Sequence, residues 1–411
     1  MSKPTVTLCM IVKDETHIIE QCLRSIAKYV DRYDITDTGS TDGTQDLIRK
    51  TMKELGVSGE VHQSDWKGFG KSRTEALRNC DGKADYAWMI DADDYIQGDF
   101  KYPSNMNADS YSLRLGRAEF MWWRNQIFKT GLDWEYVGVL HEYAQCKGKP
   151  QHEVRTDRIN GDYYVIARTE GNRNVGITPV EKYTKDAEVL YSALNNPEDP
   201  NYDPTNSRYQ FYLAQSYFDS QQWEKSFDAY QKRVEMGGWE EECFYSLFRL
   251  SIIASQMKKP FSEVCEHLRQ SYEYRPIRAE PLVELSRLYR MNGRPRTAYL
   301  YARAAAELPI PHQDILFVSE DCYKWRALDE VAATAFYMFK FQEGFDACQK
   351  LLRDNHFPES ERQRILNNYK QYEEKIKEIN RQKQQFLAQQ AANKLESLPP
   401  KKTYKKKRAR S

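Results

Sequence analysis

The fold of the N-terminal part of this chain is decided by Tyr86-Ala87-Trp88-Met89-Ile90-Asp91-Ala92-Asp93-Asp94. The first five residues are apolar or aromatic, which is typical of a buried β-strand. The carboxylates that follow therefore stand at the carboxyl end of a strand, where open α/β sheets bind their ligands. Two carboxylates two residues apart can bind one hard divalent cation, and that cation can neutralise phosphate groups. The stretch predicts a metal and ligand site at the edge of a sheet.

Strand and helix signals alternate on both sides of this stretch. In chain order, strands are predicted at 5–12, 32–36, 60–63 and 86–90, with helices at 18–30, 44–55 and 69–80 between them. Such alternation predicts an α/β domain with a mostly parallel, doubly wound sheet. Shorter strands are predicted to follow at 110–115, 126–128, 136–144 and 162–167.

A second polar stretch, Asp37-Thr38-Gly39-Ser40-Thr41-Asp42-Gly43-Thr44, ends the second predicted strand and opens a helix. Its glycines permit tight turns, and Ser40 or Thr41 is expected to cap the helix. Taken alone, the stretch is explained equally well as a strand-to-helix turn. A third stretch, from Asp65 to Arg73, lies between a strand and a helix and brings basic residues to a helix start.

The composition limits the classes of function that remain open. The chain has 411 residues, a net charge of +1 and eight cysteines. Because the last thirteen positions carry seven basic residues and no acidic one, the rest of the chain is mildly acidic, and no nucleic-acid partner is expected. The cysteines lack metal-ligand spacing and are expected to be reduced thiols. Without a signal peptide or a long apolar run, the expected location is cytoplasmic.

Beyond residue 207 the pattern becomes helical and repeats. Three helix pairs are predicted, at 209–218 with 223–236, 241–257 with 262–275, and 279–291 with 295–308. Leu213, Leu250 and Leu285 occupy corresponding positions in successive pairs. Their spacing is close to the ~34-residue period of tetratricopeptide repeats. A fourth pair is predicted from 325–341 with 345–353.

One long polar helix is predicted after the repeats. Ile365, Tyr369, Tyr372, Ile376 and Ile379 step by four and three residues, as in a heptad seam. Two interpretations remain open: a helix that covers the exposed end of the repeats, or a coiled coil that joins two copies of the chain. The basic tail from residue 399 is predicted to be disordered. It is interpreted as a solubilising end, with binding to an anionic partner as the alternative.

Four motifs in this order resemble family 2 glycosyltransferases with the GT-A fold. They are Leu8-Cys9-Met10-Ile11-Val12-Lys13-Asp14-Glu15, the stretch from Asp37 to Thr44, Asp91-Ala92-Asp93-Asp94 as the DxD motif, and the block from Trp134 to Glu142. The last block is similar to one found in members that carry tetratricopeptide repeats. The resemblance implies a GT-A catalytic domain at 1–195, tetratricopeptide-like repeats at 196–357, a long helix at 358–398 and a tail at 399–411.

The resemblance also implies roles for particular residues. Asp91, Asp93 and His141 are expected to bind Mn²⁺ or Mg²⁺, and an imidazole ligand would favour Mn²⁺. Glu142 is the expected general base. The residues expected beside the nucleotide are Val12, Glu15, Asp37, Lys71, Arg73, Asp91 and Ala92. The tryptophans Trp122, Trp123 and Trp134 are candidates for an acceptor site, with core packing as the equal alternative.

The motifs and the resemblance together imply a metal-dependent glycosyltransferase whose donor is a nucleotide sugar, with a UDP-sugar favoured. Inversion is implied by the family resemblance alone. The acceptor stays open among peptides, glycans and lipid-linked molecules, and a homodimer through the helical part is possible. A nucleotidyltransferase is the first alternative, but the acidic Lys13-Asp14-Glu15 argues against its phosphate loop. A repeat adaptor with a relic GT-A domain is the second, and the intact carboxylates argue against it.

Overall fold

The computed structural model describes residues 4–117, 120–168, 170–171 and 176–396, so the predicted disordered tail lies outside the described residues. The chain divides into two compact units. The first comprises Met1–Arg275 and Pro311–Val318, and the second comprises Pro276–Ile310 and Ser319–Ser411. Within the described ranges, no helix combines the length and the apolar character needed to cross a membrane.

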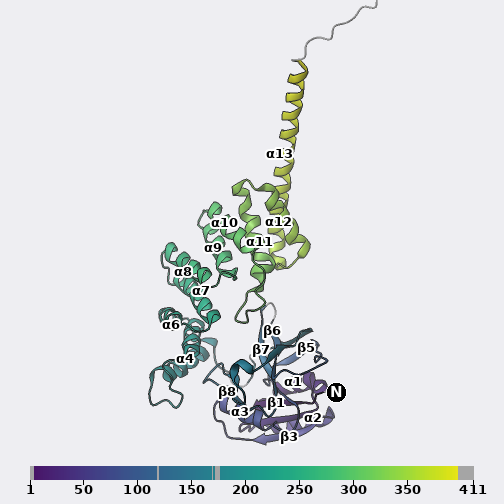
Figure 1. Cartoon of the computed structure of the whole chain (residues 1–411), viewed down its shortest axis with the longest axis vertical. Helices are drawn as coiled ribbons and strands as arrows, with labels where there is room; N and C mark the ends of the chain where they lie inside the picture. The colour runs from purple at the N-terminus through teal and green to yellow at the C-terminus, as the bar shows by residue number, and fades with distance from the viewer. Residues whose placement is uncertain (1–3, 118–119, 169, 172–175, 397–411) are drawn as a thin grey trace, which may run out of the picture. The chain divides into compact units, whose positions relative to one another are not determined.

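The first unit begins with the predicted alternation of strands and helices (Figure 1). Four neighbouring strands run parallel in the order β3-β2-β1-β4, which confirms the α/β prediction. The strands are β1 (Val6–Val12), β2 (Arg32–Asp37), β3 (Ser58–Gln63) and β4 (Tyr86–Met89), and the helices between them are α1 (Ile19–Ile26), α2 (Thr44–Glu54) and α3 (Phe69–Arg78). Val12 pairs with Asp37, so β1 and β2 end side by side.

Further strands extend this sheet beyond β4 and make it mixed. The order continues as β4-β7-β6-β11-β5, with β10 paired to β6, and β7 runs antiparallel to both of its neighbours. The added strands are β5 (Tyr95–Asp99), β6 (Ser110–Arg117), β7 (Phe120–Lys129), β10 (Thr156–Arg158) and β11 (Asp162–Ile166). Strand β7 therefore lies beside the strand that carries the DxD motif.

The predicted strand at 136–144 is wrong. The segment forms a hairpin of β8 (Trp134–Val137) and β9 (Tyr143–Cys146), with a turn at 138–142 between them. Gly138 has a φ of 118° and His141 a φ of 52°. Because a regular strand cannot hold positive φ values, the chain reverses here. The apolar pattern through this block came from two short strands rather than one.

The two faces of the sheet are covered by different elements. Alternate residues of β1, such as Leu8 and Met10, are buried in one cluster with residues of α1 and α2. Cys9, between them in sequence, belongs to a second cluster, which contains residues of α3 and the β8–β9 hairpin. This alternation of side chains is the period-2 signature of a strand buried on both faces. The sheet is therefore doubly wound, as predicted.

Five helices complete the first unit, and each packs on the next. They are α4 (Pro179–Asn195), α5 (Ser207–Asp219), α6 (Trp223–Met236), α7 (Glu240–Gln256) and α8 (Phe261–Tyr274). Two of the predicted helix pairs, α5 with α6 and α7 with α8, are confirmed. Helix α4 was not predicted, although Thr178 and Glu181 form a capping box at its start, which is a signal that the sequence offered.

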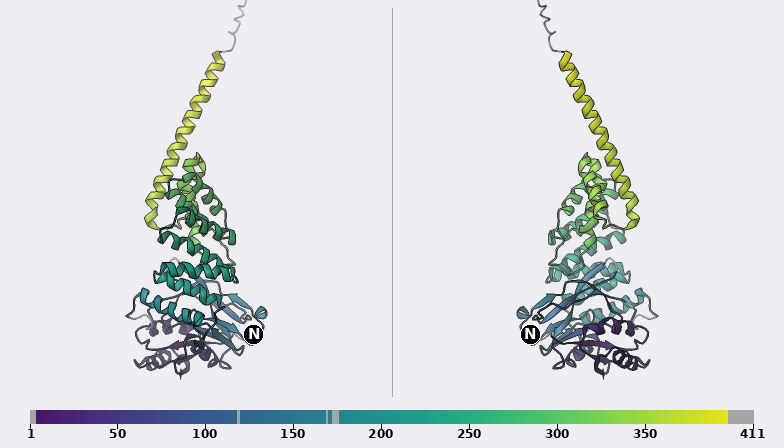
Figure 2. Two further views of the ribbon diagram at one scale, coloured as in Figure 1. Left: turned by 90° about the vertical axis from the view of Figure 1, so that its left-hand side faces the viewer. Right: turned by 90° about the vertical axis from the view of Figure 1, so that its right-hand side faces the viewer.

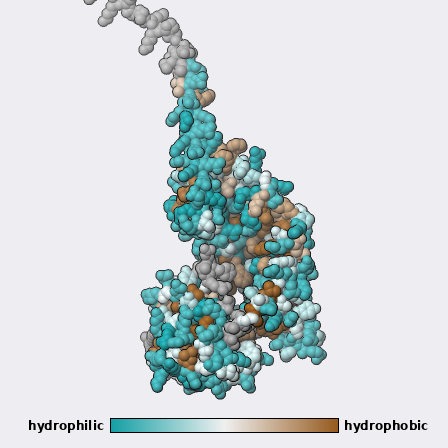
Figure 3. Space-filling model, turned by 180° about the vertical axis from the view of Figure 1, so that it is seen from behind, coloured by the Kyte–Doolittle hydropathy of each residue, from teal (hydrophilic) through white to brown (hydrophobic). Residues whose placement is uncertain are grey.

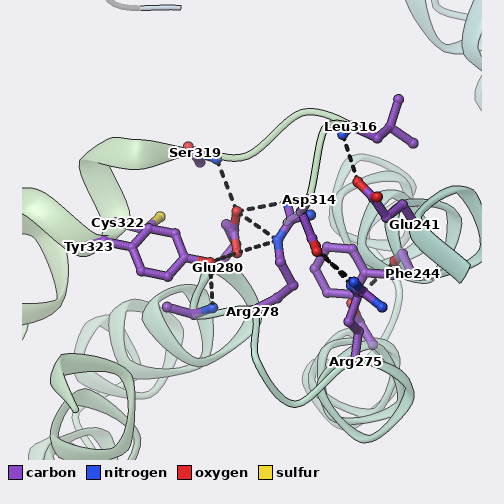
Figure 4. A network of polar contacts seen from close by, with 12 residues as sticks. Glu241, Phe244, Arg275, Arg278, Glu280, Asp314, Leu316, Ser319, Cys322 and Tyr323 are labelled. Carbon is purple, nitrogen blue, oxygen red and sulfur yellow. Dashed lines mark hydrogen bonds and ion pairs between the residues drawn. The ribbon is translucent and has the colours of Figure 1, made fainter. Parts of the chain in front are cut away.

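The second unit continues the helical repeat with α9 (Glu280–Met291), α10 (Pro295–Ala306), α11 (Ala327–Thr334) and α12 (Phe341–Asp354). The fourth predicted pair is present as α11 and α12, which pack on each other. Its first helix is irregular, because a π-helical turn precedes α11 and a 3₁₀ turn follows it. A buried carboxylate, Glu280, organises the start of α9: it accepts hydrogen bonds from Arg278, from the Ser319 N–H at 3.0 Å and from the Tyr323 hydroxyl at 2.9 Å (Figure 4).

The long helix predicted at 358–398 is present as α13 (Arg362–Glu396). Its first turns pack on α12, with Ile365 and Tyr372 buried, and the Tyr372 hydroxyl donates to the Ala332 carbonyl at 2.8 Å. Farther along, α13 extends beyond the other helices of its unit (Figure 2), and its surface is mainly hydrophilic (Figure 3). The first turns therefore cover the end of the repeats.

Candidate active site

A cavity of about 1380 Å³ lies within the first unit, at the carboxyl ends of β1 and β4. It is bounded by strand ends on one side and by residues of α4, α5 and α7 on the other. Of the predicted site residues, Asp37 and Lys71 do not line the cavity. All the others do: Val12, Glu15, Arg73, Asp91, Ala92, Asp93, His141 and Glu142.

The DxD motif forms a turn directly after β4. The Asp94 N–H donates to the Asp91 carbonyl at 3.1 Å, which closes the turn. All three residues line the cavity, but Ala92 is also packed in the sheet core, whereas Asp91 and Asp93 are not part of that cluster. The small side chain at position 92 lets the turn lie close to the sheet, with the carboxylates on either side directed into the site.

Asp91 is held between two arginines. It pairs with Arg73 of α3 and, at 3.0 Å, with Arg124 of β7, and Arg73 also pairs with Glu142. The side chains of Arg73 and Glu142 are only 9% and 7% exposed. Burial alone would favour the neutral acid, but the two guanidinium groups hold the pKa of Asp91 well below its usual range. The result is an alternating row of charges along one wall of the cavity.

Among the described residues, the other two carboxylates of the motif, Asp93 and Asp94, form no ion pair with a cationic side chain. Asp93 accepts backbone N–H groups of Glu170 at 3.2 Å and Gly171 at 3.1 Å. Burial raises the pKa of both Asp93 and Asp94, and one carboxylate oxygen of Asp94 has no hydrogen-bond partner among the described residues. Glu15 lies close by, since a Cβ built on Gly171 would be 3.4 Å from an oxygen of Glu15 and of Asp93. This arrangement gathers negative charge at one place.

The predicted metal ligands Asp91, Asp93 and His141 do not bring three ligand atoms within 4.8 Å of one another. Within the described ranges, only Asp34, Glu60 and His62 bring three such ligand atoms within 4.8 Å of one another. That group lies on β2 and β3, and Asp34 already accepts from Lys83 at 2.7 Å and from Arg32 at 2.8 Å. Because two cationic side chains offset its charge, the group is an ion-pair cluster rather than a cation site.

Asp37 shapes the second motif. It is 1% exposed, and one oxygen accepts from the N–H groups of Gly39 at 3.0 Å and Ser40 at 2.9 Å and from the Gln45 amide at 3.0 Å. Its other oxygen is buried without a partner among the described residues. The motif is thus a bonded turn, with one carboxylate oxygen unused.

The predicted cap of α2 by Ser40 or Thr41 is wrong. The N-cap residue is Gly43, which has no side chain to cap the helix, and the Asp42 carboxylate accepts the Thr44 N–H at 3.0 Å. Instead the Ser40 hydroxyl accepts the Asp14 N–H at 2.8 Å, and the Thr41 N–H donates to Asp14 at 2.7 Å. These bonds join the second motif to the loop after β1, and therefore fix the loop that carries Glu15.

His141 and Glu142 lie in the turn at 138–142 rather than in a regular strand, and this turn brings both residues to the cavity. The His141 ring stacks on Tyr212 of α5, with centroids 3.9 Å apart and planes 10° apart. Arg208, also on α5, donates to the His141 carbonyl at 3.0 Å. The helical part of the unit therefore holds the turn that carries both predicted residues.

Sequence reasoning missed Arg124, Arg208 and Tyr212. Arg124 lies two residues after Trp122 on β7. A charged residue in a strand rich in aromatic residues was the sequence signal that could have identified it. Arg208 lies 67 residues from its partner His141, and nothing local linked them. Of the candidate tryptophans, Trp122 and Trp123 line the cavity, whereas Trp134 is 5% exposed and packs on Phe128 at 5.1 Å. Trp134 is therefore a core residue.

Comparison with known proteins identifies the class of this domain. Residues 7–104 match the model of the family described as glycosyl transferase family 2. Residues 7–104 therefore form a domain of glycosyl transferase family 2, and the predicted resemblance to this family is confirmed for these residues. Arg124, His141 and Glu142 lie outside the matched residues.

Relatives match only parts of the chain. A TPR repeat-containing protein of Synechococcus elongatus is 34% identical over 92 residues, which are 22% of this chain and 21% of that protein. The chain thus aligns with about a fifth of that relative's length. S. aureus TarS in complex with UDP is 15% identical, with 66% of this chain and 90% of that chain covered and a TM-score of 0.33. The structure of MamA is 13% identical over 44% of this chain and 96% of that chain, with a TM-score of 0.31. Scores this low support no conclusion about function.

Proposed function

We propose that the chain transfers a sugar from a nucleotide-sugar donor, with a UDP-sugar favoured, to an acceptor bound in the same cavity. The observation that carries the proposal is the row of charges formed by Asp91, Arg73, Arg124 and Glu142 at the strand ends of a family 2 glycosyltransferase domain. It combines groups that stabilise a departing diphosphate with a carboxylate that can accept a proton.

The ends of β1 and β2 suit the nucleoside of the donor. Val12, Glu15 and Thr38 line the cavity there, and one buried oxygen of Asp37 has no hydrogen-bond partner within the described ranges. A carboxylate oxygen of this kind accepts a hydrogen bond from a base N–H or a ribose hydroxyl. Arg73 and Arg124 would bind the diphosphate, since guanidinium groups form strong charge-assisted bonds with phosphate oxygens.

A divalent cation fits the carboxylates of the DxD motif. Burial raises the pKa of Asp93, and one oxygen of Asp94 has no hydrogen-bond partner in the described part of the chain. We infer that Asp93 and Asp91 would hold Mn²⁺ or Mg²⁺, which would supply positive charge to the leaving diphosphate. Because Asp91 already pairs with two arginines, the cation would share that carboxylate with them. His141 as a third ligand stays a prediction, since its ring stacks on Tyr212.

Glu142 is the proposed general base. It takes the proton of the acceptor hydroxyl while that oxygen bonds to the anomeric carbon of the donor. The bond from the anomeric carbon to the diphosphate breaks, and the nucleoside diphosphate leaves with the electron pair. Arg73 keeps the Glu142 side chain in the cavity wall before the acceptor arrives. Inversion at the anomeric carbon follows from the family resemblance.

Donor binding and product release test the proposal together. The purified full chain is titrated calorimetrically with UDP-glucose, UDP-N-acetylglucosamine and GDP-mannose, with and without Mn²⁺, and UDP or GDP release is then measured. We expect one donor to bind and to be hydrolysed slowly, with Mn²⁺ raising the rate. Asp93→Asn should remove the Mn²⁺ effect, whereas the control Asp99→Asn, an exposed carboxylate paired with Lys101, should retain it.

The alternatives give different results. A nucleotidyltransferase would release pyrophosphate from a nucleoside triphosphate, and an adaptor with a relic domain would release nothing. Absence of binding by any nucleotide sugar or nucleoside diphosphate would overturn the proposal.

A further inference from the structure

The cavity is larger than one donor requires. Pockets that hold one small ligand have volumes of roughly 300–1,000 Å³, whereas this one measures about 1380 Å³. The proposed donor groups occupy only the side formed by the strand ends. The opposite side, which we name the helical wall, is formed by α4, α5, α7 and residues 315–317.

The helical wall is rich in aromatic side chains. Tyr183 of α4, Tyr212 of α5, Tyr245 of α7 and Phe317 all line the cavity. The rings of Tyr245 and Phe317 lie 4.8 Å apart. Flat apolar rings at the rim of a polar cavity suit a ligand that has apolar faces and polar edges.

A returning segment of the chain, residues 311–318, completes this wall. It is tied to α7 by Glu241, which accepts the N–H groups of Ile315 at 2.8 Å and Leu316 at 2.7 Å (Figure 4). Arg275 binds the neighbouring Asp314 side chain through two bonds, at 2.8 Å and 2.5 Å. A short stretch of backbone is thus fixed on both sides immediately before Phe317.

Phe317 itself is held in an unfavourable backbone conformation, with a φ of 48°. An aromatic residue rarely adopts a positive φ, and such residues persist only where the surroundings determine them. The hydrogen bonds to Glu241 and Arg275 hold the backbone on the N-terminal side of Phe317 in place and so maintain this conformation. As a result, the Phe317 ring packs against Tyr245 in the cavity wall.

Polar groups lie between the rings in matched pairs. The Gln215 amide donates to Asp219 at 3.0 Å and accepts from the Tyr230 hydroxyl at 2.9 Å. The Arg249 guanidinium lies 5.0 Å from the Tyr245 ring, and its buried Nε has no hydrogen-bond partner among the described residues. Among the described residues, the wall thus offers amide groups together with three basic side chains (Lys182, Arg208 and Arg249) and two acidic ones (Asp186 and Asp219).

We propose, on the basis of the proposed function, that the helical wall binds the acceptor and that the acceptor is a neutral oligosaccharide. Sugar rings present apolar faces that stack on Tyr245 and Phe317, and hydroxyl edges that bond to planar amide, carboxylate and guanidinium groups. The three basic side chains of the wall, Lys182, Arg208 and Arg249, are largely offset by the carboxylates of Asp186 and Asp219, so the wall lacks the large surplus of basic groups that a strongly anionic ligand would require. The wall is built from helices, so it offers no strand edge for a peptide backbone to extend.

Transfer assays with paired variants test this inference. The full chain is given the donor that it hydrolyses, together with malto-, chito- or manno-oligosaccharides or a mixed peptide library. We expect one oligosaccharide series to accept sugar. Tyr245→Ala and Phe317→Ala should lower kcat/KM for it by about 10-fold or more, as expected for the loss of a stacking ring. The donor KM and the slow hydrolysis without acceptor should stay unchanged.

Two further variants keep the result interpretable. Phe317→Leu retains apolar packing but removes the flat ring, so it should also lose acceptor activity with an unchanged melting temperature. Tyr337→Ala, at a tyrosine that is 52% exposed in the second unit, is the control and should behave as the wild type. Transfer to peptides alone, transfer to neither class, or unchanged kcat/KM in Tyr245→Ala and Phe317→Leu would overturn the inference. If the wild-type chain hydrolyses no nucleotide-sugar donor, that result would instead overturn the proposed function.

Discussion

The two sides of the cavity differ in how their side chains are fixed. On the sheet side, Asp91, Arg73 and Glu142 are fixed by direct ion pairs in a nearly buried row. On the helical side, Tyr212 and Tyr245 are fixed by ring contacts and by the packing of their helices. Charged groups that hold one another suit a reaction in which charge develops, because they need little rearrangement. Aromatic groups on packed helices suit recognition of a neutral ligand. Variants on each side should therefore alter different kinetic parameters.

The largest expected effect is at Glu142. Glu142→Gln keeps the shape of the side chain but removes its basicity, so kcat should fall by about 10²–10⁴-fold. Donor affinity should hardly change, since the proposed nucleoside contacts lie at the ends of β1 and β2. Single-turnover kinetics and calorimetry measure the two quantities. A normal kcat with several acceptors would make Glu142 a structural partner of Arg73 and would assign the base to another residue.

Arg73 should rank next, and it affects both chemistry and folding. Arg73→Met leaves Asp91 and Glu142 partly buried without this cation, so kcat should fall by about 10²–10³-fold. The free energy of unfolding should also fall by roughly 3–5 kcal/mol, as for other buried pairs that lose one partner. Urea denaturation and UDP release measure these effects.

The matched control for Arg73 lies on the same helix. Arg78→Met removes an arginine whose side chain is 58% exposed and whose partner Asp133 is 56% exposed, so both quantities should stay near those of the wild type. If both substitutions cost the same stability, the ion pairs of Arg73 contribute no more than an exposed pair.

Tyr212 tests whether the helical side also serves the chemistry. Tyr212→Leu removes the ring on which His141 stacks, and an aromatic contact of this kind contributes about 0.5–1.5 kcal/mol. We expect kcat to fall by up to about 10-fold with an unchanged donor KM, because the turn that carries Glu142 would be less well positioned. Tyr191→Leu, at an exposed tyrosine of α4, is the control. A change in donor KM alone would place the effect on binding instead.

The difference between the two sides also explains what the sequence could predict. Asp91, Asp93 and Val12 follow strands whose apolar runs are visible locally, and parallel strands bring their ends together whatever else the chain does. Glu142 was found through a motif, but the local pattern suggested one strand where Gly138 and His141 make a turn. The contacts of Arg208 and Tyr212 depend on how α5 packs on the hairpin. Such pairing between distant segments leaves no periodic signal in one sequence.

Lys71 is a residue that was predicted to lie at the site but does not line the cavity. The family resemblance placed it, together with Arg73, beside the nucleotide. In a helix, residues two apart face different directions, and Lys71 is exposed while Arg73 is buried. The local composition identified the helix start but not which basic residue faces the cavity.

The smallest expected effect concerns a region that belongs to neither side of the cavity. Truncation after Glu374 removes the part of α13 in which Ile379, Phe386 and Leu387 are exposed and retains Tyr372, which packs in the core of the second unit. Because the removed part buries little apolar area, the melting temperature and UDP release should change little.

If α13 only covers the end of the repeats, the molar mass from sedimentation should correspond to the same oligomeric state before and after truncation. A change from dimer to monomer would favour the coiled-coil interpretation, and a simultaneous loss of UDP release would mean that pairing of two copies supports the cavity. Replacing Phe386 with Glu in the full chain is the matched test. Phe386 lies seven residues after Ile379 and continues the heptad seam, so this substitution disturbs the seam but keeps the length of the helix.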